Sequence, residues 1–110
     1  MVVHNVQDRP SFTATINDNK IVVLDCFATW CGPCKVIAPQ VEKFSEEFPN
    51  IRFVKVDVDE VPDVAQELGI RAMPTFIVFK NGEKDKEIVG ANPVALRAAI
   101  EAAAAEVEGK

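Results

Sequence analysis

The sequence predicts a small α/β domain, in which a strand–helix–strand unit comes first and a β-hairpin comes later. An apolar run without alternation at residues 19–28 indicates a strand that is covered on both faces. An amphipathic helical pattern follows this run, and Asn81-Gly82 is a strong hairpin signal further along the chain. The expected order is β-α-β-α-β-α-β-β-α, and residues 1–110 are expected to form one domain.

The first half of the chain carries the parallel part of the expected sheet. Residues 2–6 are expected to form a strand and residues 9–17 a helix, ahead of the buried strand. The next helix runs to Pro49-Asn50, and its apolar face has helical spacing: Ile37, Val41, Phe44 and Phe48. The segment IRFVKVDVDE then alternates, which predicts a strand with one apolar side: Val54, Val56 and Val58.

The second half carries the expected hairpin between two helices. A short helix is predicted over residues 61–68, ended by Gly69 as a C-cap. Two strands follow within residues 75–90, around Asn81-Gly82. The last helix opens with Asn92 as N-cap and Pro93 at its first position. Its apolar face consists of Leu96, Ile100, Ala103 and Val107.

Composition limits the possible partners. The 110 residues are 48% hydrophobic and 26% charged, which is enough apolar material for a core without a stapling disulfide. The net charge of −5 and the pI near 4.8 argue against general binding of nucleic acid or anionic membranes. Proteins or small molecules are therefore the expected partners.

The N-terminal segment MVVHNVQDRP lacks the basic start and apolar core of a signal peptide, and no apolar run approaches the length of a membrane span. We therefore expect a soluble, cytoplasmic protein, with the nucleus as a second compartment. In a reducing compartment a cysteine pair is more often catalytic or metal-binding than structural. Because there are three cysteines, one must lack an internal partner.

The segment TWCGPCK holds two cysteines three residues apart, where the buried strand gives way to the helix. Cys31 falls at the helix N-terminus, where free N–H groups and the helix dipole stabilise a thiolate and lower its pKa. Cys34 lies one turn further on the same face, so the two can form or open a disulfide with little backbone movement. Gly32 permits a tight turn, and Pro33 suits a first helical turn. We expect an exposed Cys31 to attack a substrate disulfide and Cys34, behind it, to resolve the mixed disulfide.

Two other uses of the pair are weaker. A zinc site needs four ligands, and the chain adds only Cys26 and His4, without a second ligand pair, so we expect no metal. An inert structural disulfide would add little to the stability of the fold, because so short a loop hardly constrains the unfolded chain.

Other residues near the motif have both functional and structural interpretations. Asp25, in the buried strand, is either a proton acceptor for a thiol, with a raised pKa, or a carboxylate satisfied structurally. Lys55, on the next strand, is either its partner or a solvated lysine. Cys26 is interpreted as a small buried hydrophobe, with a regulatory thiol as the alternative. His4 is expected at the surface, away from any Cys–His nucleophile.

FATWCGPCK, GIRAMPTFIVFKNG and VGA together resemble the thioredoxin family, in its element order, from about Val2 to Ala105. The resemblance implies a thioredoxin fold, with a central five-stranded mixed sheet flanked by four helices. It implies that Cys31 is the attacking nucleophile and Cys34 the buried resolving thiol. Asp25 matches the family's buried aspartate, which assists proton transfer at the resolving cysteine, and Lys55 matches the lysine near it.

The resemblance also implies a substrate-binding surface. Pro74 matches the family's cis-proline, so Met73-Pro74 would lie against the active site. The backbone of Met73 would then pair with an extended substrate peptide. The positions that match the flat apolar docking surface are Trp30, Gly32, Pro33, Val58, Ala72, Met73, Gly90 and Ala91. Two positions depart from common family patterns: Cys26 replaces a bulky apolar residue, and Phe27 stands where bacterial members usually have tryptophan.

The function implied is that of a protein disulfide reductase recharged by an NADPH-dependent thioredoxin reductase. The implied clients are peroxiredoxins, methionine sulfoxide reductases and ribonucleotide reductase. No cofactor is expected on the chain itself, which has no glycine-rich dinucleotide loop. The absence of a histidine between the cysteines favours a reductant over an oxidant or isomerase. The rival interpretation is a binding or scaffold module whose redox state merely gates a contact.

Overall fold

The computed structural model describes residues 3–108, with the side chains of residues 3–106. The elements in chain order are β1 (Val3–Asn5), α1 (Arg9–Asp18), β2 (Ile21–Phe27), α2 (Gly32–Glu47), β3 (Arg52–Asp57), α3 (Pro62–Glu67), β4 (Thr75–Lys80), β5 (Glu83–Val89) and α4 (Pro93–Glu108). This is the order predicted from the sequence. Val2, at the start of the first predicted strand, and the side chain of Val107 lie outside the described residues.

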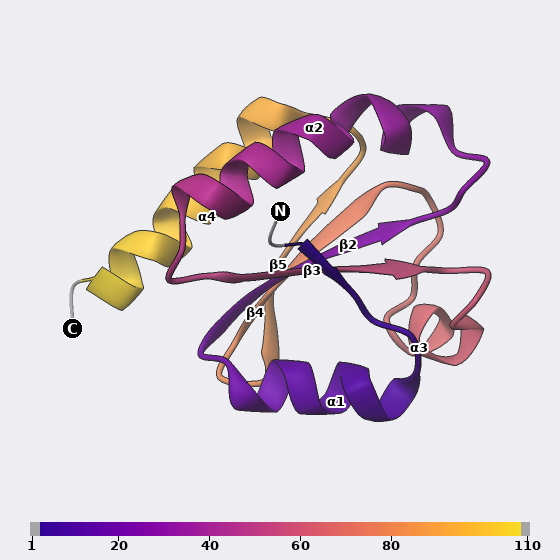
Figure 1. Cartoon of the computed structure of the whole chain (residues 1–110), viewed down its shortest axis with the longest axis horizontal. Helices are drawn as coiled ribbons and strands as arrows, with labels where there is room; N and C mark the ends of the chain where they lie inside the picture. Colours follow the sequence, from indigo (N-terminus) through magenta and orange to yellow (C-terminus); the bar gives the residue numbers. More distant parts are fainter. Residues whose placement is uncertain (1–2, 109–110) are drawn as a thin grey trace.

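The strands form one mixed sheet in the order β1-β3-β2-β4-β5 (Figure 1). β3 pairs in parallel with both β1 and β2, whereas β4 pairs antiparallel with β2 and with β5. The strand–helix–strand unit thus supplies the parallel half and the hairpin supplies the antiparallel half. The expected five-stranded mixed sheet with four helices is confirmed.

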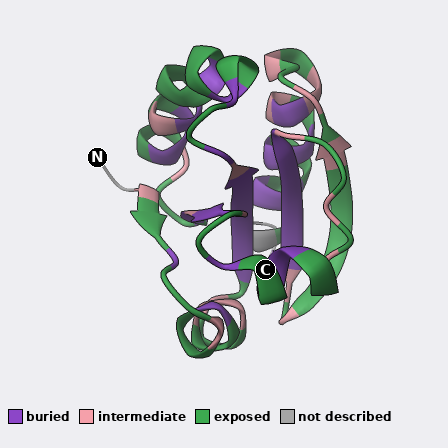
Figure 2. Cartoon of the chain, turned by 90° about the vertical axis from the view of Figure 1, so that its right-hand side faces the viewer, coloured by how far each residue is buried: buried purple, intermediate pink, exposed green. Residues whose placement is uncertain are grey.

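Helices cover both faces of the sheet, α2 and α4 on one and α1 and α3 on the other (Figure 1). On β2, Ile21 and Val23 pack in the cluster under α2 and α4, while Val22 and Leu24 pack in the cluster with α1 and α3. The central strands are accordingly buried on both sides (Figure 2). This explains why the sequence of β2 shows no alternation.

The two helices above the sheet are joined by Arg97 of α4. Its guanidinium hydrogen-bonds the carboxylate of Glu47 at the end of α2 and lies about 5.5 Å from the ring centroid of Phe44 and 5.6 Å from that of Phe48. A planar guanidinium can combine ion pairing and stacking in this way.

Within residues 3–108, no helix is long and apolar enough to cross a membrane.

The turn and cap signals of the sequence are confirmed by backbone geometry. Gly69, after α3, has φ +69°, and Asn81 and Gly82 have φ 54° and 84° between β4 and β5. Both hairpin residues with positive φ are typical of a two-residue loop that matches the strand twist. The Asn92 side chain caps α4, where its Oδ1 accepts the Ala95 N–H at 3.1 Å.

The hairpin geometry predicts the cost of a side chain at Gly82. A Cβ there would lie 3.0 Å from the Asn17 Oδ1, and φ of +84° disfavours any L-residue. Gly82→Ala is expected to lower the free energy of unfolding by about 1–2 kcal/mol. Asn81→Gly is the matched control and is expected to change it by less than about 0.5 kcal/mol. Urea denaturation measures both, and equal midpoints for the two variants would contradict this account of the turn.

Candidate active site

The two cysteines lie where β2 is joined to α2. After β2 the chain turns at once, since the Cys31 N–H donates to the Ala28 carbonyl at 3.1 Å. The Cys31 carbonyl then accepts the Lys35 N–H at 3.3 Å, and Gly32 and Pro33 form the start of α2. Cys31 is therefore the N-cap residue of a 16-residue helix. The predicted position at a helix N-terminus is confirmed.

Cys31 and Cys34 form a disulfide across the first turn of α2, with Cα atoms 5.3 Å apart. The Cys34 N–H donates to the Cys31 Sγ at 3.1 Å. An N-cap side chain ordinarily receives such a donation through oxygen, and here sulfur takes that place. Of the two sulfurs, the Cys31 Sγ is therefore the one that the helix terminus would stabilise as a thiolate.

The expectation that Cys31 is exposed is wrong for this disulfide-bonded form. Cys31 is 4% exposed and Cys34 is 6% exposed, so burial does not distinguish them. The cause is local packing: the two form an apolar cluster with Ala28, against which Phe27, Val58 and Met73 pack. It is hydrogen bonding rather than exposure that makes the two sulfurs unlike.

Asp25 is buried on β2, 7% exposed, and its Oδ1 has no hydrogen-bond partner. Burial raises its pKa to about 7, against a smaller lowering by the charge of Lys55. Asp25 and Cys34 line the same cavity of about 260 Å³, together with Ala38 of α2 and Lys55. The cavity is therefore bordered both by Cys34 and by a carboxyl whose pKa is raised to about 7.

Lys55 is half-buried on β3, opposite Asp25 in the register of the parallel pair. Its Nζ lies 5.6 Å from the ring centroid of Phe27, and within the described residues it forms no ion pair with Asp25. Lys55 therefore acts on the carboxyl through its charge and not through direct contact. This leaves Asp25 able to take up a proton near neutral pH.

Cys26 and His4 are placed away from this chemistry. Cys26 is fully buried in the cluster on the opposite face of the sheet, and burial raises the pKa of its thiol to about 12. The structure favours the interpretation of Cys26 as a small buried hydrophobe. His4 is exposed on β1 at the edge of the sheet, as predicted.

The segment between α3 and β4 approaches the disulfide through Met73, which packs against the Cys31 cluster. The Met73-Pro74 peptide bond is cis, as the family resemblance implied. Pro74 is buried, and its carbonyl accepts the Gly90 N–H at 2.8 Å, which brings the end of β5 alongside. Ala72 and Ala91 are exposed next to these residues in the chain.

Trp30 is the most exposed aromatic side chain within the described residues, at 66% exposure. Its Nε1–H donates to the Asp59 carboxylate at 2.8 Å, and the Asp59 N–H donates to Asp57 Oδ1 at 2.8 Å. These hydrogen bonds hold the indole of Trp30, the residue before Cys31, against the turn that follows β3. Sequence reasoning missed both aspartates, because the run DVDE reads as a solvated turn and nothing in it shows which carboxylate meets Trp30.

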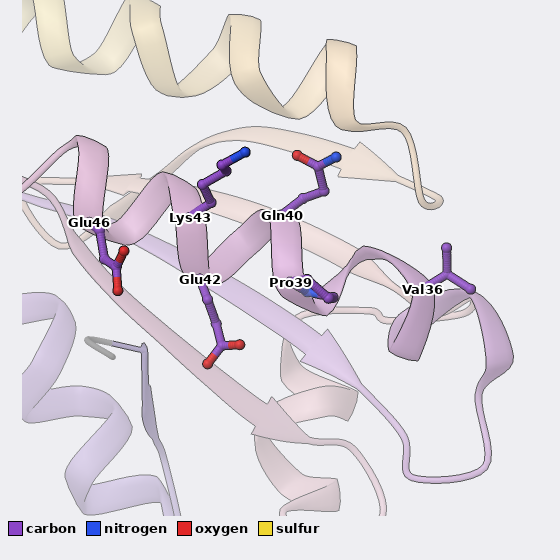
Figure 3. Close-up of a pocket in the computed structure, with 6 residues that line it drawn as sticks. All are labelled: Val36, Pro39, Gln40, Glu42, Lys43 and Glu46. Carbon is purple, nitrogen blue, oxygen red and sulfur yellow. The ribbon is translucent and has the colours of Figure 1, made fainter.

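A larger hollow, on the outer side of α2, is separate from the redox residues (Figure 3). Gln40 and Lys43 point to one side of the helix and Glu42 and Glu46 to the other. It contains no cysteine and none of the residues around the disulfide. Within the described residues, no group of three or more His, Cys, Asp or Glu side chains could hold a metal ion.

The sequence profile of the thioredoxin family matches residues 2–102 of the chain. Thioredoxin-2 of Pyricularia oryzae is 58% identical over 102 residues, which cover 93% of this chain and 60% of that protein. Thioredoxin-1 of Schizosaccharomyces pombe is 52% identical over 101 residues, 92% of this chain and 98% of that protein. The chain thus spans three-fifths of the first relative and nearly all of the second.

Solved structures give the same result. Thioredoxin of Malassezia sympodialis superposes with a TM-score of 0.89 at 48% identity, over 93% of this chain and 90% of that one. A chain from structural work on the thiol resolving mechanism in yeast mitochondrial 1-Cys peroxiredoxin via glutathione/thioredoxin systems gives a TM-score of 0.87 at 42% identity. That match covers 90% of this chain and 93% of the other.

The raised pKa of Asp25 predicts how stability depends on pH. Below the ordinary value of 3.8, the carboxyl is protonated in both folded and unfolded chains. Between pH 3.8 and about 7 the unfolded chain ionises while the folded chain keeps the proton, so stability is lost progressively, and the loss is complete once the pH has risen through about 7. Asp25→Asn removes this loss and is expected to be more stable than the wild type by up to about 4 kcal/mol at pH 8, with little difference at pH 3.5.

Urea denaturation of the oxidised proteins at several pH values measures this difference. Asp85→Asn, at an exposed position on β5, is the control and is expected to follow the wild type at every pH. A stability gain for Asp25→Asn that is the same at pH 3.5 and pH 8 would contradict the prediction.

Proposed function

The chain belongs to the thioredoxin family, and on that premise we propose that it is a protein disulfide reductase that works by dithiol–disulfide exchange. The observation that carries the proposal is the Cys34 N–H donating to the Cys31 Sγ within a disulfide at the helix N-terminus. A thiolate at this position is stabilised before the reaction and remains a competent nucleophile.

Two exchange steps account for the electrons. The Cys31 thiolate attacks one sulfur of the substrate disulfide, which forms a mixed disulfide and releases the other substrate sulfur as a thiolate. The Cys34 thiolate then attacks the Cys31 sulfur, which forms the Cys31–Cys34 disulfide and releases the second substrate thiolate. Two electrons pass from the dithiol to the substrate, and the oxidised product is the form seen here.

Asp25 is the group that we assign to proton transfer at Cys34. For Cys34 to attack, its thiol must lose a proton although the residue is only 6% exposed and packed in an apolar cluster. The cavity shared by Asp25 and Cys34, and a carboxyl pKa of about 7, support Asp25 as the acceptor. Lys55 tunes this pKa through its positive charge.

We propose that substrates dock on the surface around the disulfide. Exposed Trp30, half-buried Val58 and Met73, and the neighbouring Ala72, Gly90 and Ala91 supply the apolar contacts. No hydrogen bond of the described chain uses the backbone N–H or C=O of Met73. These groups are therefore free to pair with an extended peptide that carries the disulfide.

The partners proposed are an NADPH-dependent thioredoxin reductase, which returns two electrons to the disulfide, and client proteins with disulfides. Peroxiredoxins are proposed as clients on the strength of the yeast neighbour, and methionine sulfoxide reductases and ribonucleotide reductase by family resemblance alone. A cytoplasmic location, with the nucleus as a second compartment, is also proposed. In these reducing compartments structural disulfides are rare, and a disulfide that does form is usually catalytic, as proposed here for Cys31–Cys34.

Cysteine variants test this function. Cys31→Ser is expected to abolish catalysed reduction of insulin by dithiothreitol, because the attacking sulfur is lost. Cys34→Ser is expected to accumulate mixed disulfides with clients, because the resolving sulfur is lost. Cys26→Ala is the control and is expected to keep turnover within about twofold, since its thiol is fully buried and its pKa is raised.

Insulin turbidity measures turnover, and mass spectrometry identifies the trapped species. Together the two measurements distinguish an enzyme from a scaffold. A Cys31→Ser protein that still binds partners and loses no turnover would favour the scaffold. Failure of Cys34→Ser to trap any client would contradict the resolving role.

A further inference from the structure

Thr75 opens β4 with a buried hydroxyl that the redox chemistry does not use. The residue is 1% exposed, and its Oγ1–H donates to the Ala72 carbonyl at 2.6 Å. Its backbone is held from both sides, since Thr75 pairs with Cys26 of β2 and with Val89 of β5. The strand itself is therefore fixed without the hydroxyl.

The hydroxyl instead fixes the segment that precedes the strand. The bond satisfies the buried Thr75 hydroxyl, and at the same time it ties the carbonyl of the exposed Ala72 to the start of β4. It closes a loop across Met73 and Pro74, while the Gly90 N–H holds the Pro74 carbonyl at 2.8 Å. Met73 is thus anchored on both sides while its own N–H and C=O are left free.

We propose that Thr75 is a positioning residue for peptide substrates: its hydroxyl holds the Ala72–Met73 backbone in the orientation that lets Met73 pair with an extended disulfide-bearing segment. The proposal rests on the reductase function and specifies its substrate class. A peptide that carries the disulfide binds more tightly when the backbone of Met73 is already ordered for pairing. A small disulfide without a peptide chain makes no such backbone hydrogen bonds, so its binding does not depend on this order.

Two variants of Thr75 separate the hydroxyl from the shape of the side chain. Thr75→Val keeps the branched shape and removes the donor, and Thr75→Ser keeps the donor and removes one methyl group. Thr75→Val is expected to raise the KM for insulin about fivefold, the size of one lost hydrogen bond, with kcat within twofold. Its rate with the aromatic disulfide 5,5′-dithiobis(2-nitrobenzoate) is expected to stay within twofold. Thr75→Ser is expected to match the wild type on both substrates.

Nuclear magnetic relaxation supplies a readout that does not depend on turnover. The backbone order parameters of Ala72 and Met73 are expected to fall in Thr75→Val and to remain unchanged in Thr75→Ser. An unchanged insulin KM, an equal loss on both substrates, or an equal loss in both variants would overturn the proposal. So would a Thr75→Val protein that does not fold, because the hydroxyl would then serve the fold. If the wild type itself failed to reduce insulin, the reductase function would fall, and the order parameters would still decide the role of Thr75.

Discussion

The hydrogen bond from the Cys34 N–H to the Cys31 Sγ is the interaction on which the rest of the site depends. It exists because the chain leaves β2, the central strand, which is buried on both faces, and turns within four residues into α2. A longer connection would separate Cys31 from the helix terminus, and a later helix start would leave Cys34 without a helical N–H. The same turn places both sulfurs against Val58 and Met73, so the reactive pair is held by packing as well as by the cap.

The second constraint is the placement of a carboxyl inside the core. Residues of β2 alternate between two faces, and Asp25 shares the face of Ile21 and Val23, under α2. Burying it without a hydrogen bond to Oδ1 opposes stability at neutral pH, since the pKa rises to about 7. A fold selected for stability alone would place an apolar residue there. The proposed role of Asp25 as proton acceptor for Cys34 would explain why a carboxyl is tolerated there.

The elements were predictable because their signals are local: Asn81-Gly82 sets its own turn, Asn92 caps its own helix, and unbroken apolar sequence marks β2 as a central strand. The position of Cys31 at a helix terminus followed from the same patterns. The bonds from Trp30 to Asp59 and from Thr75 to Ala72 were not predictable, because each depends on which side chains the loops bring together. The low exposure of Cys31 was also missed, since packing by Val58 and Met73 involves distant parts of the chain.

The measurement that tests the account most directly is the pH dependence of alkylation of the reduced protein by iodoacetamide, with the modified cysteine identified by mass spectrometry. If the helix terminus stabilises the Cys31 thiolate, Cys31 is modified first, and its rate titrates with a pKa clearly below about 8.5, the value of an unperturbed cysteine. Modification of Cys34 before Cys31, or a Cys31 pKa at or above that value, would contradict the assignment of Cys31 as the attacking thiolate.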